Sequence, residues 1–158
     1  MQREGRKDTL SWTELISSLS NKKVFVTSRG KTKSLHKEQE KDNVCVVNWH
    51  TPVANDSCLI SLSKNQLTSE LIAKSGVFAI NIPEKTNLPA EVYCELHSGR
   101  FADKFEKTGL KKLEAEKIDA PVLADSLVIE CEVRQTIELG DRVVFLGKTV
   151  DIQKRGNS

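Results

Sequence analysis

The last third of the chain shows a regular alternation of apolar and charged side chains. Between positions 127 and 134, apolar Leu127, Ile129, Cys131 and Val133 alternate with charged Glu130, Glu132 and Arg134. This two-residue period is typical of a β-strand with one buried face. A turn at 139–142 leads into a return strand whose apolar residues change parity at Gly147, which predicts a β-bulge or a sharp bend there. A long antiparallel hairpin therefore indicates a mainly β fold.

Shorter apolar segments predict the rest of the architecture. Strands are expected where β-branched and aromatic side chains are frequent, at 23–28, 44–49, 58–63 and 77–82. Short helices are expected at 11–19, 69–75, 89–96 and 102–108. Gly76 and Gly109 stand where left-handed residues end helices, and Asn65 or Thr68 could cap the helix 69–75. Helices this short do not form repeated βαβ crossovers, so we expect an antiparallel barrel with helical insertions.

A polar segment at 31–42 interrupts the apolar pattern. Its lysines are interleaved with acidic residues, Lys31, Lys33, Lys37 and Lys41 with Glu38, Glu40 and Asp42. Because mixed charge is typical of a solvated surface, we interpret the segment as an exposed, mobile loop or a weak hairpin tip. A functional basic patch is the alternative.

Length and charge indicate the class of protein. The 158 residues suit one domain over 1–158. The 24 Lys plus Arg residues nearly balance 22 Asp plus Glu, so no nucleic-acid partner is expected. No apolar stretch approaches the roughly 18–20 residues of a membrane span, and no secretory signal is evident. We therefore expect a cytoplasmic protein with no membrane partner. The four cysteines lack C-x-x-C spacing, which favours free, buried thiols.

The usual catalytic motifs are missing. The chain has no G-x-G-x-x-G, P-loop, G-x-S-x-G or H-E-x-x-H motif, and we assign no catalytic residue. Cys94 and His97 stand three residues apart, so on a helix they share a face and could hold a metal. Two ligands do not make a site, and the pattern favours a buried cysteine beside a surface histidine, with no metal.

Two segments carry candidate binding groups. Asn48, Trp49, His50 and Thr51 follow a buried strand; buried polar groups need hydrogen-bonding partners, which a planar heteroaromatic ligand or a solvated turn would supply equally well. The second segment is 61–68, where hydroxyls, an amine and free N–H groups meet at the start of a helix. These are the groups that bind phosphate, although capping alone also explains them.

Taken in order, these segments resemble the flavin reductase-like, FMN-binding split-barrel family, especially its flavoredoxin branch. The similarity covers 43–153 and leaves 1–42 as a divergent N-terminal part. It rests on eight segments: 43–52, 60–72, 75–78, 81–83, 98–110, 120–121, 130–133 and 145–147. A specific example is Ser98-Gly99-Arg100 followed by Asp103-Lys104-Phe105.

The resemblance implies a Greek-key-like antiparallel split β-barrel that binds FMN at or near the interface of a homodimer. It implies that the strand 44–51 lies along the isoalloxazine ring, with Val46, Val47, Asn48, Trp49, His50 and Thr51 at the site. It places Ser61, Ser63, Lys64 and Thr68 around the phosphate, and Ser98, Arg100 and Lys104 at the border. The implied activity is electron transfer between NADH or NADPH, the flavin and an acceptor, such as a redox partner protein.

Three positions depart from the family's usual pattern. Val46 stands where a hydroxyl residue is common, Asn48 where serine or alanine is common, and Gln66 where an arginine is frequent. Lys64 could substitute for the missing charge, although a lysine is a point charge and not a bidentate fork. The alternative to an FMN-dependent oxidoreductase is therefore a non-catalytic binding module that keeps the barrel with weak or lost FMN affinity.

Overall fold

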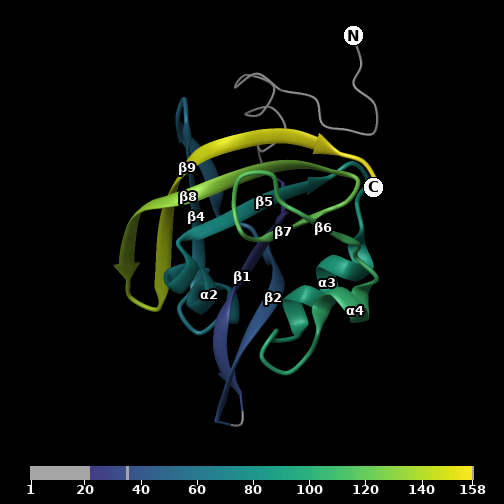
Figure 1. Ribbon diagram of the computed structural model, residues 1–158. Helices are drawn as coiled ribbons and strands as arrows, with labels where there is room; N and C mark the ends of the chain where they lie inside the picture. The colour runs from purple at the N-terminus through teal and green to yellow at the C-terminus, as the bar shows by residue number, and fades with distance from the viewer. Residues whose placement is uncertain (1–21, 35, 158) are drawn as a thin grey trace.

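A computed structural model describes residues 22–34 and 36–157 (Figure 1). The predicted helix at 11–19 lies outside this range. The strands are β1 (Val24–Ser34), β2 (Lys37–Val47), β3 (His50–Ala54), β4 (Ser57–Ser63), β5 (Val77–Pro83), β6 (Lys112–Glu114), β7 (Pro121–Leu123), β8 (Ser126–Leu139) and β9 (Arg142–Arg155). The helices are α2 (Leu67–Ser75), α3 (Leu88–Leu96) and α4 (Lys104–Thr108). No helix among the described residues is long and apolar enough to cross a membrane.

Seven strands form one antiparallel sheet, and a small hairpin of β6 and β7 stands apart from it. The sheet order is β2-β1-β5-β8-β9-β4-β3. Its two edge strands, β2 and β3, are consecutive in the chain and are separated only by Asn48 and Trp49. The chain thus joins both edges, and the Ser61 N–H of β4 donates to the Trp49 carbonyl at 2.9 Å. The predicted antiparallel split barrel is confirmed.

The strands are buried on both faces because alternate side chains enter different apolar clusters. Val24 and Val26 point into the barrel interior, whereas Phe25 between them packs with Val44, Cys94 and other residues under α3 and α4. A third cluster lies beneath the segment that precedes β8. Figure 1 shows α3 and α4 together on one side of the barrel, with α2 elsewhere. The helices therefore cover strand faces that would otherwise be exposed.

The long β8–β9 hairpin is confirmed, with two irregularities. Arg134 is the extra residue on β8, opposite Gly147, and Val150 is the extra residue on β9. The bulge expected at Gly147 therefore lies across from it, and the change of parity occurs at Val150. Glycine is required at 147 because a Cβ there would lie 2.7 Å from the Phe78 ring and 2.9 Å from the Cys131 Cβ.

The segment 31–42 forms a hairpin, which is one of the two structures expected for it. It makes up the outer halves of β1 and β2, which pair antiparallel as far as Ser34 and Lys37. Strand β3 runs through Thr51 to Ala54 with Pro52 inside it. Proline is tolerated there because β3 is an edge strand.

The C-termini of the helices were predicted more accurately than their N-termini. Gly76 and Gly109 adopt left-handed conformations, with φ of 76° and 73°, as predicted. The first residue before α2 is Gln66, and no side chain caps that helix, so neither Asn65 nor Thr68 is its cap. Asp103 caps α4 by accepting from the N–H groups of Phe105 and Glu106.

Candidate functional site

Two adjoining hollows form one groove along the seam where β2 passes into β3. They share Ser63, Gln66, Cys94 and Glu95, and their volumes are about 370 and 270 Å³. We call the part lined by 46–49, Ser61 and Arg142 the strand end. The part lined by Thr68, Ser98 and Lys104 is the helix end, because α2 begins there. The segments 46–49 and 61–68 therefore lie side by side, as the sequence analysis required.

The strand end combines an aromatic ring with a guanidinium group. Trp49 is 63% exposed, and the Arg142 guanidinium lies 4.5 Å from the centre of its ring. Arg142 also donates to the Ser61 side chain at 3.2 Å and to the Ser61 carbonyl at 2.7 Å. The hydrogen bonds to Ser61 fix the guanidinium, which in this position attracts the ring's electron-rich face.

Arg142 was missed in the sequence because it looked like a turn residue. In the structure it begins β9, directly opposite Ser63 of β4. The signal that could have found it is the hairpin register, since a turn at 140–141 brings position 142 back onto the sheet. Pairing between β4 and β9 is not visible in either strand alone.

The helix end holds a buried cation. Lys104 is 4% exposed and lines the groove, and within 22–34 and 36–157 no carboxylate pairs with its ammonium group. Nearby, Thr68 is fully buried, and its hydroxyl accepts from the Asn43 side chain at 3.0 Å. The first N–H groups of α2 have no side-chain acceptor, since the Gln66 amide oxygen accepts instead from the Ser63 N–H at 3.1 Å.

The two cysteine thiols of the groove do not supply a negative charge at neutral pH. Burial raises the pKa of the Cys45 thiol, and it raises the pKa of the Cys94 thiol to about 11, against the opposing effect of Lys104. Both thiols are therefore neutral and poor nucleophiles. Glu95 is the carboxylate lining the described groove, and it is paired with Lys23 at 3.0 Å. The helix end is thus suited to an anion.

Nine of the thirteen predicted site residues line the groove: Val46, Val47, Asn48, Trp49, Ser61, Ser63, Thr68, Ser98 and Lys104. Four side chains are engaged elsewhere. His50 contacts the Lys22 carbonyl through Nε2, and the Thr51 hydroxyl donates to the Pro52 carbonyl at 3.0 Å. Lys64 is 3.2 Å from Glu138, and Arg100 is 2.8 Å from Glu70.

Cys94 and His97 do not present a metal site together with other ligands. The His97 ring stacks on Tyr93 at a centroid distance of 3.9 Å, and its Nδ1 is 3.0 Å from the Tyr93 carbonyl oxygen. Within the described part of the chain, no three His, Cys, Asp or Glu side chains are grouped for a metal ion.

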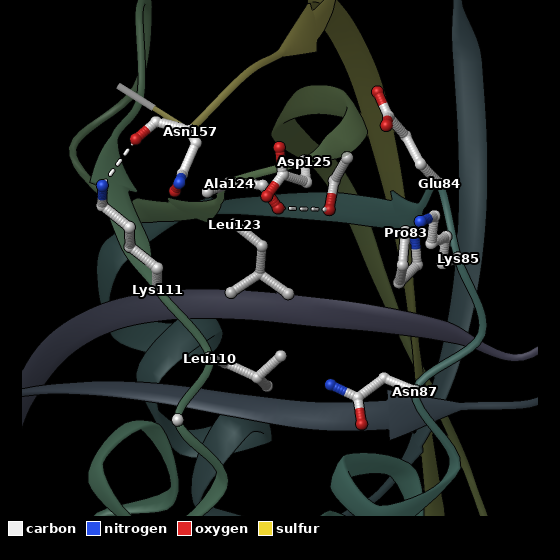
Figure 2. A pocket seen from close by; sticks show the side chains of 12 residues that line it. Pro83, Glu84, Lys85, Asn87, Leu110, Lys111, Leu123, Ala124, Asp125 and Asn157 are labelled. Carbon is white, nitrogen blue, oxygen red and sulfur yellow. Dashed lines mark hydrogen bonds between the residues drawn. The ribbon is translucent and has the colours of Figure 1, made fainter.

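A larger hollow of about 570 Å³ lies between the ends of β5 and β7 (Figure 2). Leu110 and Leu123 point into it, and two of its polar side chains bond to the protein itself. Lys111 donates to the Asn157 carbonyl, and Asn87 caps α3 by accepting from the Ala90 N–H. This hollow contains none of the predicted site residues and no buried charged residue, so the groove is the better candidate site.

The chain is similar to curated proteins and to solved structures. An uncharacterized protein of Archaeoglobus fulgidus is 27% identical over 116 residues, which cover 72% of this chain and 66% of that protein. The chain thus spans just under two thirds of that relative. The flavoredoxin of Desulfovibrio vulgaris (Miyazaki F) superimposes with a TM-score of 0.71 at 25% identity, covering 83% of this chain and 68% of the flavoredoxin.

The flavoredoxin of Methanosarcina acetivorans is similar as well. Its TM-score is 0.65 at 27% identity, with 82% of this chain and 68% of that chain covered. The family model described as "Flavin reductase like domain" matches residues 16–158, which is more of the chain than the segments that carried the resemblance. The chain belongs to the flavin reductase-like family.

Proposed function

We propose that the protein binds FMN in the groove and acts as an oxidoreductase of the flavin reductase or flavoredoxin type. The observation that carries this proposal is Lys104, a residue only 4% exposed that lines the groove and has no acidic partner among the described residues. A buried cation needs a counter-charge. In a flavin reductase-like chain, the phosphate of FMN is the natural candidate.

The helix end fits the phosphate. Lys104 supplies a positive charge, Ser63 and Ser98 supply hydroxyls, and the start of α2 supplies N–H groups without side-chain acceptors. Charge-assisted hydrogen bonds of this kind are about twice as strong as neutral ones. Lys64 is not assigned a contact with the phosphate, because its ion pair with Glu138 directs it elsewhere.

The strand end fits the flat ring. Asn48 and Trp49 line one stretch of it, and Ser61 and Arg142 line the other. A bound flavin would supply the redox chemistry, while the protein residues orient it and set its electrostatic surroundings. Because the flavin would supply the redox chemistry, the protein needs no catalytic residue of its own, and none was assigned from the sequence. NADH or NADPH is the proposed donor, and a small molecule or a redox partner protein is the proposed acceptor.

The groove also suits a site near a homodimer interface. Leu88, Val92 and Leu96 recur at four-residue spacing along α3 and are all exposed, so they form an apolar stripe on one helix face. Leu96 also lines the helix end of the groove. A second copy that covered this stripe would lie against the site. We place this assembly in the cytoplasm.

The first test is a flavin titration of the purified protein. A change in the flavin absorbance bands and quenching of FMN fluorescence are expected when FMN is mixed with the protein. Riboflavin, which lacks the phosphate, is expected to bind more weakly. Oxidation of NADH or NADPH in the presence of FMN then tests for turnover. A protein that takes up neither flavin would contradict the proposal and favour a non-catalytic binding module with the same fold.

A further inference from the structure

Two of the free cysteines lie in the barrel interior, away from the groove. Cys58 is near the start of β4 and Cys131 is in β8, and both belong to the interior apolar cluster. The two residues are more than seventy positions apart in sequence, and in the sheet order β9 separates their strands. Since side chains of strands that are not neighbours usually stay apart, a contact between these two thiols needs a local cause.

Gly147 of β9 provides the space in which the two thiols meet. Cys58 is directly paired with Gly147, and the Cys131 Cβ is 2.9 Å from the point that a Cβ of residue 147 would occupy. A side chain at 147 would therefore stand between the two cysteines. With glycine there, the Cys58 and Cys131 thiols hydrogen-bond to each other.

A hydroxyl group lies beside the two thiols. Thr149 is directly paired with Cys131 across β8 and β9, and its Oγ1 is 3.9 Å from the Cys58 Sγ. Thr149 is half-buried, and its N–H donates to the Asp56 carbonyl at 2.7 Å. The two thiols therefore lie beside a partly exposed residue and near the turn between β3 and β4, where a small molecule can approach.

The two thiols differ in acidity. The hydrogen bond from Cys131 lowers the pKa of the Cys58 thiol, against the effect of burial and with the help of Thr149. The same contact, together with burial, raises the pKa of the Cys131 thiol. Because the thiolate is the form of cysteine that reacts with oxidants, Cys58 is the nucleophile of this pair and Cys131 is the resolving thiol.

We propose that Cys58 and Cys131 form a reversible disulfide when the protein meets hydrogen peroxide. The Cys58 thiolate attacks one peroxide oxygen, the O–O bond breaks, and the leaving oxygen takes up a proton to become water. The Cys131 sulfur then attacks the Cys58 sulfenic acid, loses its own proton and displaces a second water. Two thiols are oxidised to one disulfide, and one peroxide is reduced to two waters.

The disulfide would join β4 to β8, the strands on either side of β9. The two sulfurs would move from hydrogen-bonding contact to a bond of about 2.05 Å, and no side chain at 147 lies in the way. These three strands could then separate fully only after the disulfide is reduced. The oxidation site does not depend on flavin binding in the groove.

The test uses the full chain without added flavin. The protein is treated with hydrogen peroxide, unfolded in the presence of N-ethylmaleimide, digested and analysed by mass spectrometry. The free thiols are expected to fall from four to two, with a new cross-linked peptide that contains Cys58 and Cys131. Dithiothreitol is expected to restore all four thiols.

Variants separate the roles of the two cysteines. In Cys131→Ala, peroxide is expected to leave a sulfenic acid at Cys58, which dimedone traps. Cys94→Ala is the matched control and is expected to keep the disulfide, because Cys94 is a buried cysteine whose thiol has no hydrogen-bonding cysteine among the described residues. Thr149→Val is expected to slow disulfide formation about 10-fold, because the reacting thiolate loses a hydrogen bond, and Thr149→Ser is expected to restore the rate.

The proposal is overturned if peroxide leaves four free thiols, or if the cross-linked peptide joins a different pair of cysteines. It is equally overturned if Cys94→Ala abolishes the disulfide as Cys131→Ala does. Since no flavin is present in this experiment, its outcome is independent of the FMN titration, and either proposal can fail without the other.

Discussion

Glu130 and Lys104 are both buried charged residues, and their surroundings are opposite. The Glu130 carboxylate, fully buried, accepts from the backbone N–H groups of Glu116, Lys117 and Ile118 and from the Gln153 side chain. Lys104 is almost as deeply buried, yet no carboxylate among residues 22–34 and 36–157 pairs with it. The first charge is satisfied by the protein, and the second faces the groove.

This difference separates a structural charge from a proposed binding charge. Glu130 ties the segment 116–118 to the barrel, so its hydrogen bonds stabilise the fold. Among the described residues, Lys104 has no such hydrogen bond through its ammonium group, so this charge is the one we propose to meet a ligand. A buried charge without an internal partner therefore identifies the site better than the size of a cavity does.

The largest effect is expected for Glu130→Gln. The amide can no longer accept from all three backbone N–H groups, and leaving such buried donors unsatisfied costs about 3 kcal/mol of unfolding free energy. Urea unfolding followed by circular dichroism measures this loss. Glu132→Gln, an exposed glutamate on the same strand, is the matched control and is expected to have little effect. Equal stability of the two variants would show that Glu130 is not a structural charge.

A large effect on binding, without a loss of stability, is expected for Lys104→Met. Removing one charge-assisted contact of about 1.5–3 kcal/mol raises the Kd for FMN about 10- to 100-fold. Riboflavin binding is expected to be unchanged, because it has no phosphate, and the unfolding free energy is expected to stay equal or rise. Lys107→Met, an exposed lysine on the same helix, is the control. A variant that unfolds more easily but binds FMN normally would reverse the assignment of the two charges.

A smaller effect is expected at the opposite end of the groove for Arg142→Lys. Lysine keeps the charge but loses the two-point hold on Ser61 and the stacking on Trp49, which are worth about 0.5–1 kcal/mol at an exposed site. FMN and riboflavin should both bind about 2- to 5-fold more weakly. Arg134→Lys on the other arm of the hairpin serves as the control. An effect confined to FMN would indicate that Arg142 contacts the phosphate.

The smallest effect concerns Glu70, a charge near the surface. The hydrogen bond from Thr32, helped by Arg100 and Lys74, lowers its pKa to about 2 from the usual 4.5. The stabilisation is present above about pH 4.5 and is lost as the pH falls towards 2. Because the side chain is 27% exposed, the contribution is about 1 kcal/mol or less. Unfolding midpoints at pH 6 and pH 3 should differ less in Glu70→Gln than in the unmodified protein.

The fold was predictable where one strand alone carries the signal. The alternation at 127–134 identified β8, and glycines identified the ends of α2 and α4. For the segment 31–42 the sequence left a mobile loop and a weak hairpin tip open, because the charges that decide between them pair across two strands: Lys31 pairs with Glu40, and Lys33 with Glu38. Opposite charges facing one another across a hairpin stabilise it, but in sequence they look like a mixed, solvated surface.

The residue types of the candidate site could be predicted from the sequence, whereas the directions of their side chains could be predicted less well. Ser63 and Thr68 line the groove as expected, because they stand where β4 ends and α2 begins. The side-chain direction of Lys64 depends on Glu138, more than seventy positions away. Arg142 reaches the groove only through the register of β4 with β9. Such long-range pairings are not encoded in any short motif.

The junction that closes the barrel also lines the groove, so separation of the two edge strands is coupled to ligand binding in the groove. Asn48 and Trp49, which join the two edge strands, also form a wall of the strand end, and the Ser61 amide bridges the junction. Separation of the edge strands β2 and β3 would therefore also disrupt this wall of the groove. We expect hydrogen–deuterium exchange at the Ser61 amide to slow when a ligand fills the groove, so that this single proton reports on occupancy.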